Sequence, residues 1–238
     1  LMKILALDSS AVSASAAVLD DDKVLGEFFI NTKQTHSQTL MPMVQQVLTQ
    51  TKTSLEEMDL FAVSAGPGSF TGVRIGVACV KGMAFAQNKP CIGVSTLEAM
   101  AYPLSMLNGI ICAVMDARCQ QVYHALFRVN GIEVERICDD CAVAISDLAE
   151  SLKQYSNETI YLVGDGAKLC YESEAFQPLQ VRLVAEHLQY QRAVGVAQCA
   201  ALHLKQEDCT VTAEQLAPVY LRLPQAEREL KKKLEGTT

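Results

Sequence analysis

Residues 2–30 read MKILALDSSAVSASAAVLDDDKVLGEFFI, and residues 110–137 read IICAVMDARCQQVYHALFRVNGIEVERI. Each stretch opens with an apolar, strand-like run that ends in a carboxylate, Asp8 in the first and Asp116 in the second. Each then continues through a turn into two further strand-like runs. Asp116 follows Asp8 by 108 residues. An internal repeat of this length predicts two halves of similar fold.

The segments that follow each repeat alternate helical and strand-like patterns, which predicts an α/β protein with two mixed sheets and flanking helices. We place the boundary at residue 104, so that the subdomains are 1–104 and 105–238. Thr35 and Gln38 fit a capping box at the first helix, and Pro42 is expected to kink or delay that helix. The predicted helices are 40–51, 71–87, a short one from Thr96, 146–155 with Ser146 as N-cap, 192–205 and 227–234; the predicted later strands are 60–64, 91–94, 160–163, 181–184 and 216–223.

Composition limits the function classes. The chain has 238 residues, of which 50% are apolar and 20% charged, and its net charge is −7. It can therefore bury a core, but it lacks the excess of Lys and Arg that a phosphate-binding face needs, so any contact with nucleic acid is expected to be indirect. Without an apolar run of about 18 residues or a signal-peptide pattern, we expect a cytoplasmic protein with no membrane contact. The nine cysteines suit reduced thiols, and the pair Cys138 and Cys141 lacks the four ligands of structural zinc.

Two loops carry possible chemistry. Asp8-Ser9-Ser10 places a carboxylate and small polar residues at a strand end, where they could hold a phosphate and magnesium, or where Asp8 could merely cap its own turn. The stretch Gly66-Pro67-Gly68-Ser69-Phe70-Thr71-Gly72 joins a strand to a helix but matches neither G-x-G-x-x-G nor a P-loop, which disfavours a standard dinucleotide or Walker site. The four histidines are dispersed, with no H-x-x-x-H pair, so we expect no catalytic residues and no metal site.

The helix predicted at 71–87 has small or apolar residues on two sides, with Gly72, Gly76 and Cys79 on one side and Arg74 on the other. Such a helix is expected to lie between its own sheet and either the preceding helix or a partner chain. We therefore predict an interface built from this helix and the one before it. Its residues are Leu40, Met43, Val44, Val47, Gly72, Arg74, Ile75, Gly76 and Cys79.

Five stretches together resemble the TsaB (YeaZ) family over nearly the whole chain. They are KILALDSS at 3–10, HSQ at 36–38, AGPGSFTGVRIG at 65–76, DAR at 116–118 and PVYLR at 218–222. The resemblance implies the actin-like (ribonuclease H-like) fold of sugar kinases and chaperone ATPases. It also implies a subunit of the bacterial machinery that makes threonylcarbamoyladenosine at position 37 of tRNAs reading ANN codons.

The family is described as a non-catalytic paralogue of TsaD, the subunit that holds the metal and transfers the threonylcarbamoyl group. Where TsaD carries a His-x-x-x-His pair, this chain has Thr96 and Met100, and Glu98 alone remains. A lone carboxylate cannot replace two imidazoles, so the resemblance implies that this metal site is lost. The second turn, at Asp116, lacks a glycine pair, which argues against ATP turnover by this chain and leaves no expected cofactor.

The resemblance thus implies a scaffold that forms a homodimer in isolation, dimerises with TsaD, recruits the ATPase TsaE and meets tRNA only through the complex. A second hypothesis is a nucleotide-dependent phosphotransferase or ATPase of the actin-like class that uses Asp8, with Ser9 and Ser10 at the phosphate. Metal-dependent hydrolysis, the third class, has no ligand set in the sequence.

Overall fold

A computed structural model describes residues 2–131, 133–206 and 209–222, so the helix predicted at 227–234 lies outside the described residues. The first half consists of β1 (Lys3–Asp8), β2 (Ala14–Asp20), β3 (Lys23–Ile30), α1 (His36–Thr51), β4 (Leu60–Gly66), α2 (Phe70–Gln87), β5 (Cys91–Ser95) and α3 (Thr96–Ala101). The second half consists of β6 (Asn108–Asp116), β7 (Gln121–Asn130), β8 (Val134–Arg136), β9 (Cys141–Ala144), α4 (Ile145–Leu152), β10 (Ile160–Val163), α5 (Ala167–Tyr171), β11 (Val181–Leu183) and α6 (Ala193–Gln206).

The two sheets have the same topology. The first has the order β3-β2-β1-β4-β5, and the main path of the second, read from its other edge, is β8-β7-β6-β10-β11. In both sheets the first three strands pair antiparallel with one another. The last two strands run parallel to each other and to the first strand, which they extend on its other edge. β9 adds a pairing to β7 that has no counterpart in the first sheet. The repeat read from the sequence is therefore a duplication of the whole sheet, and the expected actin-like α/β class is confirmed.

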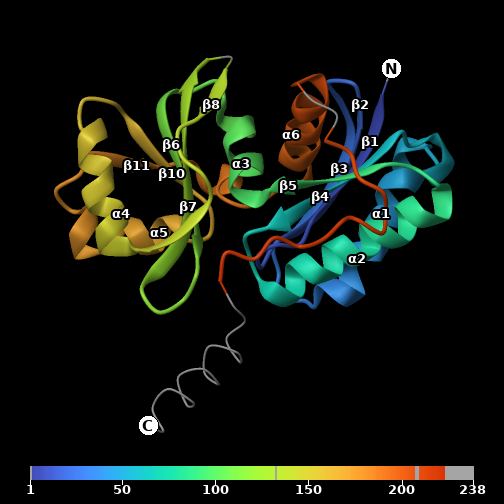
Figure 1. The fold of residues 1–238 in the computed structure, drawn as a ribbon, viewed down its shortest axis with the longest axis horizontal. Coiled ribbons are helices and arrows are strands. Elements are labelled where there is room, and N and C mark those ends of the chain that lie inside the picture. Colours follow the sequence, from blue (N-terminus) through green and yellow to red (C-terminus); the bar gives the residue numbers. More distant parts are fainter. Residues whose placement is uncertain (1, 132, 207–208, 223–238) are drawn as a thin grey trace, which may run out of the picture.

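Helices cover both faces of each sheet (Figure 1). Leu5 and Leu7 of β1 face α1 and α2, whereas Ile4 and Ala6 face α6, because successive side chains of a strand point to opposite faces. This explains why β1 reads as an unbroken apolar run. In the second sheet, α4 and α5 pack on one face and α3 on the other.

Two helices are exchanged between the halves. α3 follows β5 of the first sheet and packs mainly on the second sheet, with Ala99 turned toward the first, and α6 follows β11 of the second sheet but packs on the first. The two helices contact each other between the sheets. The division into 1–104 and 105–238 thus separates the two sheets, but α3 and α6 each pack across it. That these two segments are domains stays a prediction.

Several local predictions were wrong. Thr35 is the N-cap of α1 but its hydroxyl bonds the Gln38 side chain at 3.3 Å, with no bond to the backbone, and the helix starts six residues before Pro42 rather than being delayed by it. The N-cap of α4 is Ala144, not Ser146, and β9 and α5 were not predicted.

The strand predicted at 216–223 is also wrong for the residues the structure describes, 216–222, which are not a strand. This segment is instead held by single contacts, to the first half and, through Arg222 and the Ala117 carbonyl at 2.6 Å, to the second. Lys81 Nζ donates to the carbonyls of Glu214 at 3.1 Å and Leu216 at 3.0 Å, and the Val219 amide donates to the Ala65 carbonyl at 2.7 Å. It brings the chain back along α2 to the cleft between the sheets. None of the helices in the described ranges is both long and apolar enough to cross a membrane.

Candidate functional site

A cavity of about 400 Å³ lies where the two halves meet. The turn after β1 and the start of α2 form one wall, the ends of β6 and β10 form the other, and the segment 219–222 closes one side. Its polar lining comes from Ser10, Ser69, Thr71, Asp116, Arg118, Tyr123, Asp165, Tyr220 and Arg222. Both repeated carboxylate turns therefore meet at one place, as the duplication predicts.

Asp8 is buried and its carboxylate is fully used inside the chain. Oδ1 accepts from the Ser10 amide at 3.0 Å and from the Ser10 hydroxyl at 2.9 Å, and Oδ2 accepts from the Ser64 hydroxyl. Burial raises the pKa of Asp8 above its ordinary value, and the Ser64 and Ser10 hydrogen bonds oppose that rise. Asp8 does not line the cavity; of the predicted nucleotide-binding residues only Ser10 does.

Ser9 anchors this turn to α2. Its hydroxyl donates to the Gly72 carbonyl at 2.9 Å, and a Cβ on Gly72 would lie 2.1 Å from the Ser9 carbonyl oxygen. A Cβ on Gly76 would lie 2.7 Å from Ser9 Oγ. Both glycines are buried against the turn of their own chain. Their small size admits the Ser9 turn, and their predicted place in an interface stays a prediction.

The second turn is built differently. Asp116 Oδ1 accepts from the Arg118 amide at 2.7 Å, and residues 118–120 have positive φ angles of 66°, 54° and 56°. Asp165, from the turn after β10, accepts from Gln191 Nε2 at 3.0 Å. Burial, helped by the charges of Asp116 and Asp8 and opposed by the Gln191 bond, raises the pKa of Asp165 to about 6. One wall of the cavity thus holds a carboxyl group that is neutral in mild acid.

The apolar stripe of α1 is core. The side chains of Leu40, Met43, Val44 and Val47 are buried, and α1 packs on β2, β3 and α2 of the same chain. α1 thus turns this apolar stripe toward its own sheet, and the place of these four residues in an interface stays a prediction. Outward it presents polar residues and Met41, which is 43% exposed.

The outer side of α2 is different. Arg74 is exposed, Ile75 and Cys79 are half-buried, and Phe85 is 70% exposed. The Arg74 guanidinium lies 3.9 Å from the centre of the Phe70 ring, and its Nε donates to the Tyr220 hydroxyl at 2.7 Å. These three of the nine predicted interface residues, Arg74, Ile75 and Cys79, remain reachable by a second chain.

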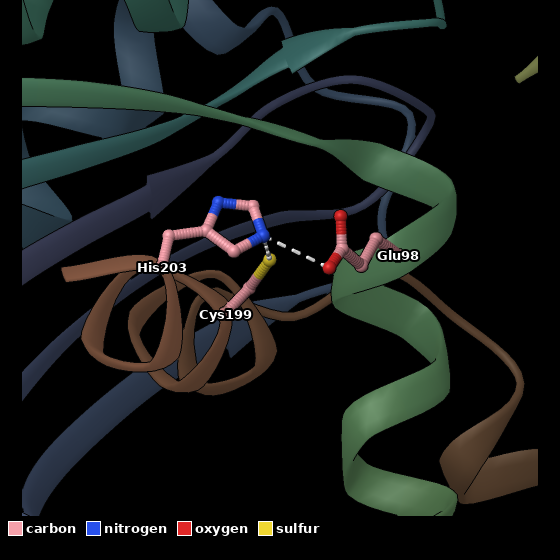
Figure 2. A group of neighbouring side chains, drawn as sticks. All are labelled: Glu98, Cys199 and His203. Carbon is pink, nitrogen blue, oxygen red and sulfur yellow. Dashed lines mark hydrogen bonds and ion pairs between the residues drawn. The ribbon is translucent and has the colours of Figure 1, made fainter. Parts of the chain in front are cut away.

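The sequence suggested that Glu98 stands alone, but in the structure it has partners. In Figure 2 it projects from α3 toward Cys199 and His203 of α6. Glu98 Oε1 lies 2.9 Å from His203 Nε2, and Oε2 accepts from Arg136 at 2.8 Å. Burial alone would raise the pKa of Glu98, but the His203 and Arg136 contacts outweigh it and lower the pKa to about 2. The sequence did hold one signal that we missed: Cys199 and His203 are spaced by one helical turn.

The nine cysteines form no disulfide, in line with the expected reduced thiols. Cys138 Sγ accepts from the Leu126 amide at 3.3 Å, and Cys141 Sγ lies 3.1 Å from His124 Nε2. Burial raises the pKa of both thiols and lowers that of His124. The pair is therefore uncharged at neutral pH and gives no support for redox chemistry.

Comparisons with known proteins agree on one family. The family model described as "TsaD: tRNA N6-adenosine threonylcarbamoyltransferase" matches residues 23–230. The chain is 31% identical over 234 residues to the "tRNA threonylcarbamoyladenosine biosynthesis protein TsaB" of Bacillus subtilis (strain 168), which covers 95% of this chain and 96% of that protein. Over 135 residues it is 42% identical to the protein of the same name from Escherichia coli (strain K12), covering 55% of this chain and 58% of that one.

The solved structure described as "YeaZ from Pseudomonas aeruginosa" superposes with a TM-score of 0.77 at 27% identity, and the match covers 93% of this chain and 100% of that one.

Proposed function

Since the chain belongs to the TsaB (YeaZ) family, we propose that it is a non-catalytic subunit in the synthesis of threonylcarbamoyladenosine at position 37 of tRNAs. Its relatives carry that pathway in their names. It supports a reaction that a TsaD-type subunit performs, and it recruits the ATPase TsaE to the complex. With a net charge of −7 it meets tRNA only through its partners, in the cytoplasm.

The uncovered side of α2 carries this proposal. The inner stripe of the helix is buried on the first sheet, whereas the outer side presents Arg74, Ala78, Gly82 and Phe85, which are exposed and include a single charge. Phe85 and, on neighbouring α1, Met41 are among the most exposed large apolar side chains of the described residues. A helix side of this composition is typical of an interface core, where charged residues are depleted and aromatic residues enriched.

The occupant is a TsaD-type chain, and in its absence a second copy of this chain. The match of residues 23–230 to the TsaD family model relates the two subunits as paralogues, so we expect each to offer the same helix pair, and pairing like surfaces closes a symmetric contact. Small residues such as Ala78 and Gly82 let two helices approach closely. The homodimer and the heteromer therefore compete for one surface.

The arrangement around Asp8 supports a role without catalysis. A phosphate-binding carboxylate must face its ligand, but the oxygens of Asp8 are bonded to Ser10 and Ser64 inside the chain. The lining of the cavity includes Asp116 and Asp165, whose negative charge repels phosphate unless a cation intervenes.

The test places a charge on the proposed surface. Phe85→Glu should fold normally, because the side chain is 70% exposed, and should weaken binding to TsaD at least tenfold by leaving a carboxylate unpaired in an apolar contact. Met106→Glu is the matched control, since Met106 is an apolar residue 78% exposed and lies outside α1 and α2. Binding is measured by calorimetry and folding by circular dichroism. Full TsaD binding by Phe85→Glu would overturn the proposed surface.

A modification assay tests the pathway itself. TsaD, TsaE, tRNA and the threonylcarbamoyl donor are combined with this chain, without it, with Phe85→Glu and with Met106→Glu. Product should form only with the unmodified chain or the Met106→Glu control. Equal product without this chain would contradict the scaffold role.

The cavity favours a second candidate, a nucleotide-dependent phosphotransferase or ATPase, because it lies between the two carboxylate turns. Calorimetry with ATP and magnesium on the isolated chain separates the two. Tight binding with hydrolysis that is lost in Asp8→Asn would favour the enzyme; no hydrolysis would favour the scaffold.

A further inference from the structure

Three side chains of different chemistry meet where α3 contacts α6. Cys199 and His203 lie one turn apart on α6, and Glu98 approaches them from α3 (Figure 2). Their candidate ligand atoms all lie within 4.8 Å of one another. A thiol, an imidazole and a carboxyl group are the donors that Zn²⁺ takes in proteins. We propose that Glu98, Cys199 and His203 bind a transition-metal ion with the ligand preferences of Zn²⁺.

The distances suit a tetrahedral ion. Bonds of about 2.3 Å to sulfur and about 2.0 Å to nitrogen separate the two ligand atoms by about 3.5 Å, and Cys199 Sγ lies 3.7 Å from His203 Nε2. Tetrahedral nitrogen and oxygen ligands lie about 3.3 Å apart, whereas Nε2 and Glu98 Oε1 are 2.9 Å apart as a hydrogen-bonded pair. Admitting the ion therefore requires Nε2 and Oε1 to separate by about 0.4 Å. Three protein ligands leave a fourth position for water.

Neighbouring groups already orient the carboxylate. Arg136 donates to Glu98 Oε2 at 2.8 Å and to Asp140 at 2.7 Å, so Oε1 is the oxygen left to face Cys199 and His203. The Tyr102 hydroxyl donates to Oε1 at 3.3 Å. Such contacts fix the orientation of a metal ligand and account for much of a site's affinity.

Metal binding here replaces protons. The ion takes the thiolate of Cys199, whose proton passes to solvent, and bonds neutral His203 at Nε2. The proton that Nε2 shared with Glu98 moves to Nδ1 or, where both ring nitrogens were protonated, to solvent, so that the bound imidazole carries one proton on Nδ1. The thiolate and the Glu98 carboxylate together balance the two positive charges of the ion.

An approach from solvent exists. Cys199 is buried, but the His203 side chain is 29% exposed. Beside the cluster, a cavity of about 670 Å³ is lined by Tyr102, which bonds Glu98, and by Leu202 of the same helix turn as His203. An ion there would bridge α3, α6 and, through Arg136, the second sheet, and would join the two exchanged helices.

The test uses Co²⁺ as a spectroscopic probe on the full chain, stripped with a chelator, in a Cys119→Ser background that removes the exposed thiol. We expect saturable binding of one Co²⁺ per chain, with the near-ultraviolet charge-transfer absorption that thiolate ligation produces, and displacement by Zn²⁺. Cys199→Ser should abolish that absorption, and His203→Ala should weaken Co²⁺ binding at least tenfold. Cys170→Ser, at a buried cysteine in the second core, should change neither.

Two results would overturn the site. One is the absence of saturable Co²⁺ binding. The other is charge-transfer absorption that survives Cys199→Ser and disappears when Cys138 and Cys141 are both replaced by Ser. Circular dichroism checks each variant for folding. If Cys199→Ser does not fold, His203→Ala and Glu98→Gln decide, because undiminished Co²⁺ affinity in both would also refute the assignment.

Discussion

The turn after β1 and the turn after β6 each follow the first strand of their sheet and begin at an aspartate, yet they are stabilised in different ways. The first is buried and tied to Ser64 and to α2, a helix of 18 residues. The second bonds mainly within itself and faces α5, a helix of five residues. The difference teaches that equal strand order does not create equal sites. The helix that follows β4, or its equivalent β10, decides how tightly the turn is packed.

Glycines make the close approach in both halves. In the first half a Cβ at Gly68 would lie 2.4 Å from the Ser10 carbonyl oxygen, and in the second a Cβ at Gly166 would lie 2.8 Å from the Met115 carbonyl carbon. The second half therefore has a glycine for this close approach, but it follows β10. The turn at Asp116 itself has none. The first turn is additionally packed against Gly72 and Gly76.

The largest expected effect follows from Gly72→Ala. Its Cβ would overlap the Ser9 carbonyl oxygen, a backbone atom that cannot move alone, so we expect the free energy of unfolding to fall by about 3 kcal/mol or more. Gly82→Ala on the same helix meets nothing within 4 Å and should raise stability by about 0.5–1 kcal/mol. Urea denaturation measures both. Gly166→Ala should fall between them, and a greater loss there than at Gly72 would reverse the contrast between the turns.

Ser64→Ala tests the hydrogen bonding of the buried aspartate. It removes the donor to Asp8 Oδ2, and an unpaired buried oxygen should lower the free energy of unfolding by about 2 kcal/mol. It should also raise the pKa of Asp8 further, since the Ser64 bond lowers it. Ser37→Ala, at an exposed serine of α1, is the control. Equal stability of the two variants would show that Asp8 needs no partner.

Asp165→Asn tests the second turn through pH. The folded pKa of about 6 lies above the ordinary value of 3.8, so the folded chain holds this proton while the unfolded chain loses it. The stability from this group is complete below pH 3.8 and is lost as pH rises through 6. The variant should therefore match the wild type in acid and exceed it by about 1–3 kcal/mol above pH 6.

Thermal unfolding across this pH range measures the difference. Asp139→Asn, at an exposed carboxylate, controls for the change in net charge. A stability difference between Asp165→Asn and wild type that does not vary with pH would contradict the shifted pKa.

Arg118→Ala should have the smallest effect. The Arg118 side chain is 81% exposed and its ion pair with Asp116 is 3.3 Å long, so solvent screens the charge and the loss should stay below about 0.5 kcal/mol. Chemical denaturation at low and high salt measures it. A larger, salt-independent loss would mean that the second turn depends on Arg118 as the first depends on Ser64.

Most of the fold could be predicted because its signals are local. The β1 and β6 runs, their terminal aspartates and the helical spacing of 71–87 are patterns within about 20 residues, and the structure contains each of them. The strand prediction for 216–222 failed because Leu216 packs on the first core while Val219 and Tyr220 are exposed, and the Val219 amide makes a single bond to Ala65 instead of a sheet ladder. The candidate site was predicted only in part: Ser10 lines the cavity, while Asp165 and the Glu98 cluster were missed.

The sequence by itself determined the duplication, the first strand of each half and the apolar stripe on α1, because hydrophobic periodicity is a local property of the chain. Only the tertiary structure decided whether an apolar helix side faces its own sheet or the solvent. Val44 is buried on its own sheet and Phe85 is left outside, although both are apolar residues on helices. Likewise Glu98 and His203 are 105 positions apart and meet only because α3 and α6 exchange sheets. Burial and long-range contact are properties of the assembled core, and no local pattern encodes them.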